Sequence, residues 1–308
     1  MNWLIATDLD GTLLDDDYDL VAAAAALDRQ AALGHEIALA SSKTFSEMLQ
    51  LASLCGRSPT LIFENGAGVA WPERLWRKTD AGPVRHGFRV QLQGEGYIRL
   101  RAVLRALQRS SGARYQGFAD MSVAQIAELT GLSTSGAALA RERQASEPLR
   151  WLDTPEALQR FEQALRQRGY RLVKGGRFHH VMPRTDKACA VSALARRLTE
   201  KHAARVRVLC CGDSANDRAM LRGADVAVVF PRPDGSVLAV ERDGSTDRDG
   251  STDREGSTDR EGSTGAAVPA MVLHAATAGA DAWTQAITDA LRRCGSAETR
   301  APGGSAHE

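Results

Sequence analysis

The first 63 residues alternate between short apolar runs and longer stretches with helical spacing, and this alternation limits the choice of fold more than any other feature. Apolar runs predict strands at 3–6, 36–40 and 60–63. The alanine-rich stretch 20–33, which ends at a glycine, and the stretch 45–54 predict the helices between them. Strands and helices in this order form a parallel sheet with crossover helices. The sequence therefore predicts an α/β fold.

Two carboxylates stand directly after the first predicted strand. Asp8 and Asp10 are two residues apart and are followed by Gly11, so the strand ends in a tight loop. Residues i and i+2 of an extended chain point the same way, and ligands bind at this edge of a parallel sheet. Two such acids repel each other unless a cation or a proton lies between them, and oxygen ligands favour Mg²⁺. The pattern indicates metal-assisted chemistry; the alternative is a solvated Asp-Gly turn.

Polar residues also follow two other predicted strands. Ser41–Thr44 lead from the second strand into a helix, where hydroxyls, backbone N–H groups and the helix dipole can bind an anion. Ordinary N-capping is the alternative. The run 206–211 predicts a strand that ends in a loop with Asp213 and Asp217, and Lys187 lies at the start of a predicted helix. Acids thus reach the carboxyl edge of the sheet for a second time.

Residues 83–185 have a different texture, with shorter strands and helices in mixed order. This pattern predicts a separate α+β unit inserted into the first domain. The unit carries several potential anion-binding side chains: Arg141, Arg143, Lys174, Arg177, His179 and His180. Charged residues on helices are usually solvated and histidines are usually structural, so each of these has that alternative interpretation.

Charge and cysteine content narrow the class of ligand. The net charge of +1 gives no electrostatic signal for nucleic acid or a membrane surface, and it favours a small-molecule ligand. The five cysteines show no metal-type spacing, and reduced thiols in a cytosol are the simplest explanation. The chain starts without a signal-like segment and has no apolar run of spanning length, so we expect a cytoplasmic protein.

A hexapeptide repeat lies near the C-terminus. Residues 244–264 repeat Gly-Ser-Thr-Asp-Arg-Asp/Glu without any apolar residue, so we expect a disordered insertion with no part in the chemistry. Residues 268–273 predict a further strand and 283–293 a closing helix. The segment 295–308 is expected to form a flexible tail.

Four short motifs occur in order along the chain: Asp8-x-Asp10-Gly-Thr, a serine at Ser41 after the second strand, Lys187, and Gly212-Asp213-x-x-Asn216-Asp217. This combination resembles the haloacid dehalogenase superfamily. Longer stretches are similar to the mannosyl-3-phosphoglycerate phosphatase family, namely 41–44, 63–67, 120–132, 141–148 and 175–182. Three of these stretches lie in the inserted unit, where such phosphatases select the substrate.

The resemblance implies a Rossmann-like core, formed by residues 1–82 and 186–294, and a mobile α+β cap, residues 83–185, that closes over the substrate. It implies that Asp8 is the nucleophile and Asp10 the general acid/base of a phosphatase. The implied ligands of Mg²⁺ are Asp8, the Asp10 carbonyl and Asp213. The other implied roles are phosphoryl binding by Ser41, Lys187 and Asn216, with Ser42 as the alternative to Ser41, and orientation of ligands or of Lys187 by Asp217.

The substrate implied by the resemblance is mannosyl-3-phosphoglycerate, hydrolysed to mannosylglycerate and phosphate through an aspartyl-phosphate. Its carboxylate and hydroxyls point to contacts with Lys43, Asn65, Glu142, Arg143, Arg177 and His180. Glucosyl-3-phosphoglycerate or another sugar phosphate is an alternative, since mannose and glucose differ in the orientation of one hydroxyl. A phosphomutase and a non-catalytic sugar-phosphate-binding protein are further alternatives.

Overall fold

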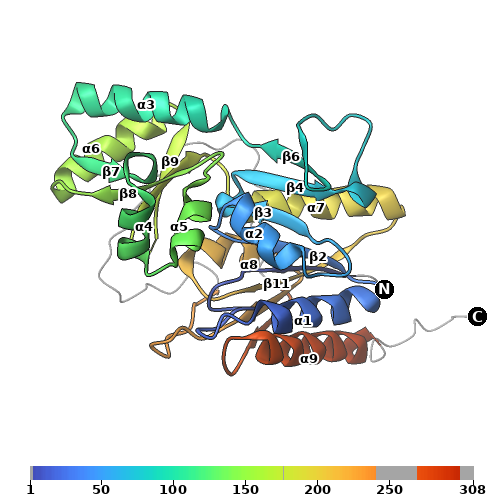
Figure 1. Cartoon of the computed structure of the whole chain (residues 1–308). Coiled ribbons are helices and arrows are strands. Elements are labelled where there is room, and N and C mark those ends of the chain that lie inside the picture. Colours follow the sequence, from blue (N-terminus) through green and yellow to red (C-terminus); the bar gives the residue numbers. More distant parts are fainter. Residues whose placement is uncertain (1–2, 176, 241–268, 299–308) are drawn as a thin grey trace, which may run out of the picture.

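Two sheets organise the chain (Figure 1). The structure is a computed structural model that describes residues 3–175, 177–240 and 269–298. The larger sheet has nine strands in the spatial order β13 (Met271–His274), β12 (Val226–Val229), β11 (Arg207–Gly212), β1 (Trp3–Thr7), β2 (Glu36–Ala40), β3 (Thr60–Phe63), β4 (Gly68–Pro72), β6 (Phe88–Leu92) and β5 (Val84–Arg85). The pairs from β13 to β3 are parallel and those from β3 to β5 antiparallel.

Helices cover both faces of this sheet. One face carries α1 (Leu20–Ala32), α2 (Phe45–Ala52) and α9 (Ala280–Glu298), of which α1 and α9 lie side by side (Figure 1). The other face carries α7 (Lys187–His202) and α8 (Arg218–Arg222). Successive side chains of a strand point to opposite faces, so Ile5 packs into the first layer and Leu4 into the second. Burial on both sides explains why β1 is a continuous apolar run.

The smaller sheet belongs to a second unit, residues 96–183, which is called the cap below. Its four antiparallel strands are β7 (Tyr115–Gly117), β8 (Glu147–Trp151), β10 (His179–Pro183) and β9 (Tyr170–Lys174), in that spatial order. The helices α3 (Gly96–Ser111) and α6 (Pro155–Arg166) pack on this sheet through a separate apolar cluster. The pair α4 (Val123–Thr130) and α5 (Thr134–Arg141) forms another cluster, and α5 contacts α2 of the core.

The register of the central strands brings two loops together. Thr7 of β1 pairs with Cys211 of β11, and the Asp8 N–H donates to the Cys211 carbonyl over 3.0 Å. Asp8 and Asp213 therefore leave neighbouring parallel strands at the same edge. The loops contain short 3₁₀ helices at η1 (Glu64–Gly66), η2 (Glu73–Leu75), η3 (Phe118–Asp120) and η4 (Ala215–Asp217).

The predicted α/β fold class is confirmed, but several predicted boundaries change. The strand Phe88–Leu92, predicted to belong to the inserted unit, pairs with β4 in the core sheet, so the chain leaves that sheet after residue 92 rather than at 82. The closing helix runs over Ala280–Glu298, so residues 295–298 are helical and not part of a tail. The repeat at 244–264 and residues 299–308 lie outside the described residues. Within the described part, no helix has both the length and the apolarity to cross a membrane.

Candidate active site

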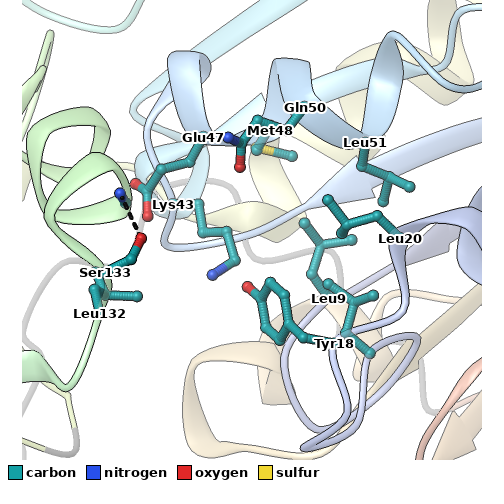
Figure 2. A pocket seen from close by; sticks show the side chains of 12 residues that line it. Leu9, Tyr18, Leu20, Lys43, Glu47, Met48, Gln50, Leu51, Leu132 and Ser133 are labelled. Atoms are coloured by element: carbon teal, nitrogen blue, oxygen red, sulfur yellow. Dashed lines mark hydrogen bonds between the residues drawn. The ribbon is translucent and has the colours of Figure 1, made fainter.

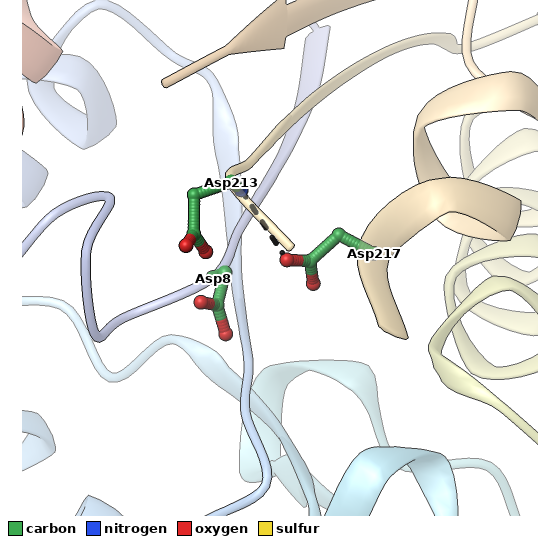
Figure 3. Close-up of side chains that lie close together, drawn as sticks. All are labelled: Asp8, Asp213 and Asp217. Atoms are coloured by element: carbon green, nitrogen blue, oxygen red, sulfur yellow. Dashed lines mark hydrogen bonds between the residues drawn. The ribbon is translucent and has the colours of Figure 1, made fainter. Parts of the chain in front are cut away.

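Three carboxylates meet at the carboxyl edge of β1 and β11 (Figure 3). One oxygen from each of Asp8, Asp213 and Asp217 lies within 4.8 Å of the other two. Asp217 is fully buried, and Asp8 and Asp213 are 6% and 9% exposed. Three carboxylates with so little exposure to solvent need compensating positive charge.

Lys187 supplies part of that charge. It is the first residue of α7, and its side chain is 1% exposed. Its ammonium donates to Asp8 Oδ1 over 2.7 Å and to Asp217 Oδ1 over 2.6 Å. Burial opposes its charge, but Asp217 and Asp8 outweigh burial and raise the pKa of Lys187. The lysine is therefore a fixed cation that touches the predicted nucleophile.

Asp217 is engaged by its own loop. Its Oδ2 accepts from the N–H groups of Asp213 and Ser214, over 3.3 and 3.1 Å, and from Ser214 Oγ over 3.0 Å. Its Oδ1 accepts from Lys187. A carboxylate with both oxygens occupied in this way orients the loop and the lysine, as the predicted role for Asp217 requires.

Asp8 and Asp213 are the carboxylates with capacity for a cation. Burial and the nearby Asp217 carboxylate raise the pKa of Asp8, although Lys187 lowers it. Burial and Asp217 also raise the pKa of Asp213 to about 6. One ammonium thus faces three acids, and the excess of negative charge favours another cation. The donors are oxygens, so this set fits a hard ion such as Mg²⁺.

The Asp10 carboxylate is held by two residues beside this cluster. Lys43 Nζ lies 3.0 Å from Asp10 Oδ2, and the Tyr18 hydroxyl donates to Oδ1 over 2.8 Å. The Lys43 ammonium also lies 5.0 Å from the centre of the Tyr18 ring. Burial opposes the charge of Lys43, but Asp10 and Tyr18 outweigh it and raise the pKa of Lys43. The predicted general acid/base therefore starts as one member of an ion pair.

A cavity of about 210 Å³ adjoins Lys43 and Tyr18 (Figure 2). Its apolar wall comes from the core, with Leu9, Leu14, Leu20, Met48 and Leu51. Leu132, Ser133 and Gly136 of the cap close the opposite side. The two partners of Asp10 thus form the polar end of a space bounded by both the core and the cap.

The loop that follows β2 is held by its own hydrogen bonds. Ser41 is buried, and its Oγ accepts from the Lys43 N–H over 3.2 Å. The N-cap of α2 is Thr44, which forms a reciprocal capping box with Glu47. Thr44 is therefore the residue that caps the helix, as the alternative interpretation predicts. Ser41 lies before the helix, and its hydroxyl does not cap it. Ser42 is half-buried, and its carbonyl accepts from Arg143.

Asparagines connect two of the loops. Asn216 Nδ2 donates to Asn65 Oδ1 over 3.1 Å, and Asn216 Oδ1 accepts from Ser214 Oγ. Asn65 is 6% exposed and has φ 58°, a left-handed conformation that asparagine tolerates. The structure therefore brings both predicted amides to the edge that carries the acids.

The predicted substrate contacts in the cap have other partners here. The Arg143 guanidinium donates to the Ser42 carbonyl and to Ser146 Oγ, the latter over 2.6 Å, and Glu142 accepts from Ser46 Oγ over 2.6 Å. Arg143 and Glu142 therefore form hydrogen bonds that connect the cap to the core.

Arg177 and His180 lie farther along the cap. The exposed Arg177 donates to the Leu129 carbonyl over 2.8 Å. Burial and Arg143 lower the pKa of His180 to about 3, and its Nδ1 has no hydrogen-bond partner among the described residues. His180 is therefore neutral and leaves one ring nitrogen for a ligand.

Two family models match separate parts of the chain. The model for haloacid dehalogenase-like hydrolases matches residues 5–78, which carry Asp8 and Asp10. The model for sucrose-6F-phosphate phosphohydrolase matches residues 123–246, from the cap to beyond Asp217. Both models describe hydrolases, and the four acids of the site lie within the matched segments.

Solved structures share the fold of this chain at low identity. A phosphatase of the haloalkanoate superfamily from Bacteroides thetaiotaomicron is 17% identical, with a TM-score of 0.57 over 96% of both chains. A haloacid dehalogenase-like hydrolase from the same organism is 19% identical (TM-score 0.50; 74% of this chain and 88% of that one). One from B. subtilis is 18% identical (TM-score 0.50; 73% and 88%).

Three residues at the site were not predicted from the sequence. Tyr18 holds Asp10, Glu64 binds the cap, and Arg232 Nε donates to the Asp213 carbonyl over 3.2 Å. Arg232 comes shortly after the apolar run that forms β12, and a basic residue just beyond a strand end was a usable signal. Tyr18 and Glu64 stand in local sequence that is typical of solvated turns.

Proposed function

We propose that the chain is a Mg²⁺-dependent phosphatase of a phosphorylated sugar derivative, with mannosyl-3-phosphoglycerate as the first candidate substrate. The observation that carries the proposal is the buried Lys187 ammonium, 2.7 Å from Asp8 and 2.6 Å from Asp217, beside Asp213. A nucleophilic carboxylate fixed against a cation at the edge of a parallel sheet fits in-line phosphoryl transfer. A cytoplasmic location remains a prediction.

In the proposed first step, an Asp8 oxygen attacks phosphorus and the bond from phosphorus to the leaving oxygen breaks, which gives an aspartyl-phosphate. Asp10 takes a proton from solvent when the substrate displaces it from Lys43, and it gives this proton to the leaving alkoxide. It later takes a proton from the water that hydrolyses the acyl phosphate. Lys187 and Ser41 hold phosphoryl oxygens. When bound by Asp8, Asp213 and the Asp10 carbonyl, Mg²⁺ would neutralise charge on the phosphoryl group.

The position of Lys43 supports an anionic group near the leaving oxygen. Its ammonium is 3.0 Å from Asp10, the residue that would protonate that oxygen. A substrate carboxylate at Lys43 would compete with Asp10 for the ammonium and release Asp10 for proton transfer. A phosphoglycerate presents a carboxylate beside its phosphate ester, which is the reason to rank this substrate class first.

A second candidate is a sugar phosphate without the glycerate. The match of residues 123–246 to sucrose-6F-phosphate phosphohydrolase covers much of the cap and supports a sugar phosphate in general. Glucosyl-3-phosphoglycerate also stays a candidate, since no described contact distinguishes the two sugars.

Phosphate release decides among these candidates. We would compare mannosyl-3-phosphoglycerate, glucosyl-3-phosphoglycerate, sucrose 6F-phosphate and mannose 6-phosphate, with Mg²⁺ and with a chelator. We expect preference for the first substrate, loss with chelator and loss in Asp8→Asn, whereas Asp16→Asn, an exposed acid of the same loop, keeps activity. Preference for sucrose 6F-phosphate would establish the second candidate. A requirement for a phosphorylated cofactor would indicate a phosphomutase, and absence of turnover would support a binding protein.

A further inference from the structure

The acid at the end of β3 is bound by the cap rather than by solvent. Glu64 is fully buried. Its Oε1 accepts from the Gln144 N–H over 2.7 Å. Its Oε2 accepts from the Ala145 and Ser146 N–H groups over 3.0 and 2.6 Å, and from Ser146 Oγ over 2.7 Å. One core carboxylate therefore receives three consecutive backbone N–H groups of the cap, an arrangement called the Glu64 clamp below.

Arg143 completes the Glu64 clamp. Its Nε lies 3.6 Å from Glu64 Oε2, and its terminal nitrogens donate to Ser146 Oγ and to the Ser42 carbonyl of the core. The Arg143 side chain is 3% exposed, so the ion pair is shielded from water. If the cap moved away, three N–H groups and two charges would need new partners. The clamp thus favours a docked cap.

The backbone of the same turn is held in an uncommon conformation. Glu64 and Asn65 have φ 51° and 58°, which is a left-handed conformation for two consecutive residues with side chains. The Glu64 N–H donates to the Lys43 carbonyl over 2.8 Å, and the Asn65 N–H donates to the Ser41 carbonyl over 2.9 Å. Surrounding contacts maintain such strain, and here they come from the predicted phosphate loop.

The turn also touches the catalytic lysine and the acidic loop. Asn65 accepts from Asn216, which belongs to η4 beside Asp217. Gly66 has φ 90°, and a Cβ there would lie 2.2 Å from the Asp186 carbonyl and 2.9 Å from the Lys187 nitrogen. The start of α7 is therefore packed directly on the turn. Three consecutive residues contact the cap, the Ser41 loop, the Asn216 loop and the Lys187 helix.

We infer that Glu64 is a positioning residue that couples docking of the cap to alignment of the phosphoryl-binding groups. This inference rests on the proposed phosphatase function. When the hydrogen bonds of the Glu64 clamp are formed, the turn keeps Lys187, Asn216 and Ser41 in their relative positions. When these hydrogen bonds are lost, the cap no longer supports the turn. Substrates that fill the space under the cap depend on the clamp, and a small phosphate donor that needs only the core edge depends on it much less.

The test uses the full chain with Mg²⁺ and two classes of substrate. Glu64→Gln keeps the size of the side chain but replaces one acceptor oxygen with an NH₂ group that faces N–H donors. The control is Glu95→Gln, between the core sheet and α3 of the cap, where an exposed carboxylate pairs with Arg99 over 3.1 Å. Kcat and KM are measured for the best sugar phosphate and for acetyl phosphate.

We expect Glu64→Gln to lower kcat/KM for the sugar phosphate about 100-fold, partly through kcat, and for acetyl phosphate less than about threefold. Glu95→Gln should change both by less than about threefold. Equal losses for both substrates would overturn the coupling and leave Glu64 with a purely structural role. Unchanged kinetics would overturn the inference entirely.

Hydrogen exchange separates this inference from the proposed function. The amides of residues 144–146 should exchange faster in Glu64→Gln than in the wild type, whatever substrate the enzyme uses. If the wild type hydrolysed no phosphate ester but this exchange increased, the clamp would stand and the proposed function would fall; unchanged exchange would refute the clamp. If Glu64→Gln did not fold, Ser146→Ala, which removes the hydroxyl contact, should give a smaller change in the same direction, and no change would refute the inference.

Discussion

Replacing Lys187 with methionine gives the sharpest test of the electrostatics of the site. The substitution keeps an unbranched side chain of similar length but removes the ammonium that lies between Asp8 and Asp217. Two buried carboxylates then face each other and Asp213 without their cation. Removal of one partner from a buried ion pair typically costs about 3–5 kcal/mol, because the remaining charge is uncompensated.

The structure sets an upper limit to that loss. At an effective dielectric constant of about 20, unit charges 2.7 Å apart attract by roughly 6 kcal/mol. The variant can instead protonate one carboxylate, which costs about 1.4 kcal/mol per pH unit above a pKa near 3.9, or about 5.6 kcal/mol at pH 8 and about 2.9 kcal/mol at pH 6. A carboxylate whose pKa is higher in the folded than in the unfolded state stabilises the folded protein at low pH, and this contribution is lost as the pH rises. The loss should therefore shrink on acidification.

Urea denaturation with a chelator measures this effect. We expect Lys187→Met to lose about 3–5 kcal/mol of unfolding free energy at pH 8 and about 2 kcal/mol less than that at pH 6. Lys201→Met, on the exposed end of the same helix, should lose less than about 1 kcal/mol at both values. A loss below about 1 kcal/mol at pH 8, or one that does not change with pH, would refute the assignment of Lys187 as the compensating cation.

Three further predictions follow from the site and its supports. Burial and Asp217 raise the pKa of Asp213 to about 6, so protons should compete with Mg²⁺ below that pH. The Mg²⁺ concentration for half-maximal activity should then rise about tenfold per pH unit, and Asp213→Asn should weaken this dependence. Burial and Arg143 lower the pKa of His180 to about 3, so only the unfolded state binds a proton at this residue between about pH 6.5 and 3. From pH 7 to 5 the wild type should therefore lose about 2 kcal/mol more unfolding free energy than His180→Gln in urea denaturation. Equal losses would contradict the assignment. Gly66→Ala should cost more than about 2 kcal/mol, because the new Cβ would lie 2.2 Å from the Asp186 carbonyl, whereas Gly87→Ala, also at positive φ but with nothing within 4 Å, should cost about 1 kcal/mol in the same assay.

The acid cluster could be predicted from the sequence because it depends on local patterns. Strands buried on both faces are continuous apolar runs, and the residue after each run lies at the carboxyl edge of the sheet. Asp8 and Asp213 follow such runs, so their proximity needs only the parallel order of β1 and β11. Mg²⁺ and the residue roles remain predictions that the geometry supports.

Contacts between distant segments could not be predicted in this way. The partners of Glu64 are backbone N–H groups some 80 positions away, and backbone donors have no signature in residue type. Arg143 has the residue type of an anion binder, but a guanidinium also binds carbonyl oxygens, and it meets the Ser42 carbonyl. The strand Phe88–Leu92 has strand periodicity, which does not indicate the sheet that it joins.

The pairing of β1 with β11 has a consequence for the order in which the chain folds during synthesis. The strand of Asp8 leaves the ribosome first, but its neighbour β11 follows only after the whole cap. One edge of β1 therefore stays unpaired while the cap is made. The cap sheet pairs only residues 115–183, so it can form in that interval and shorten the loop that β11 must close. We expect the cap sheet to be complete before the strands that lead to Asp8 and Asp213 pair with each other.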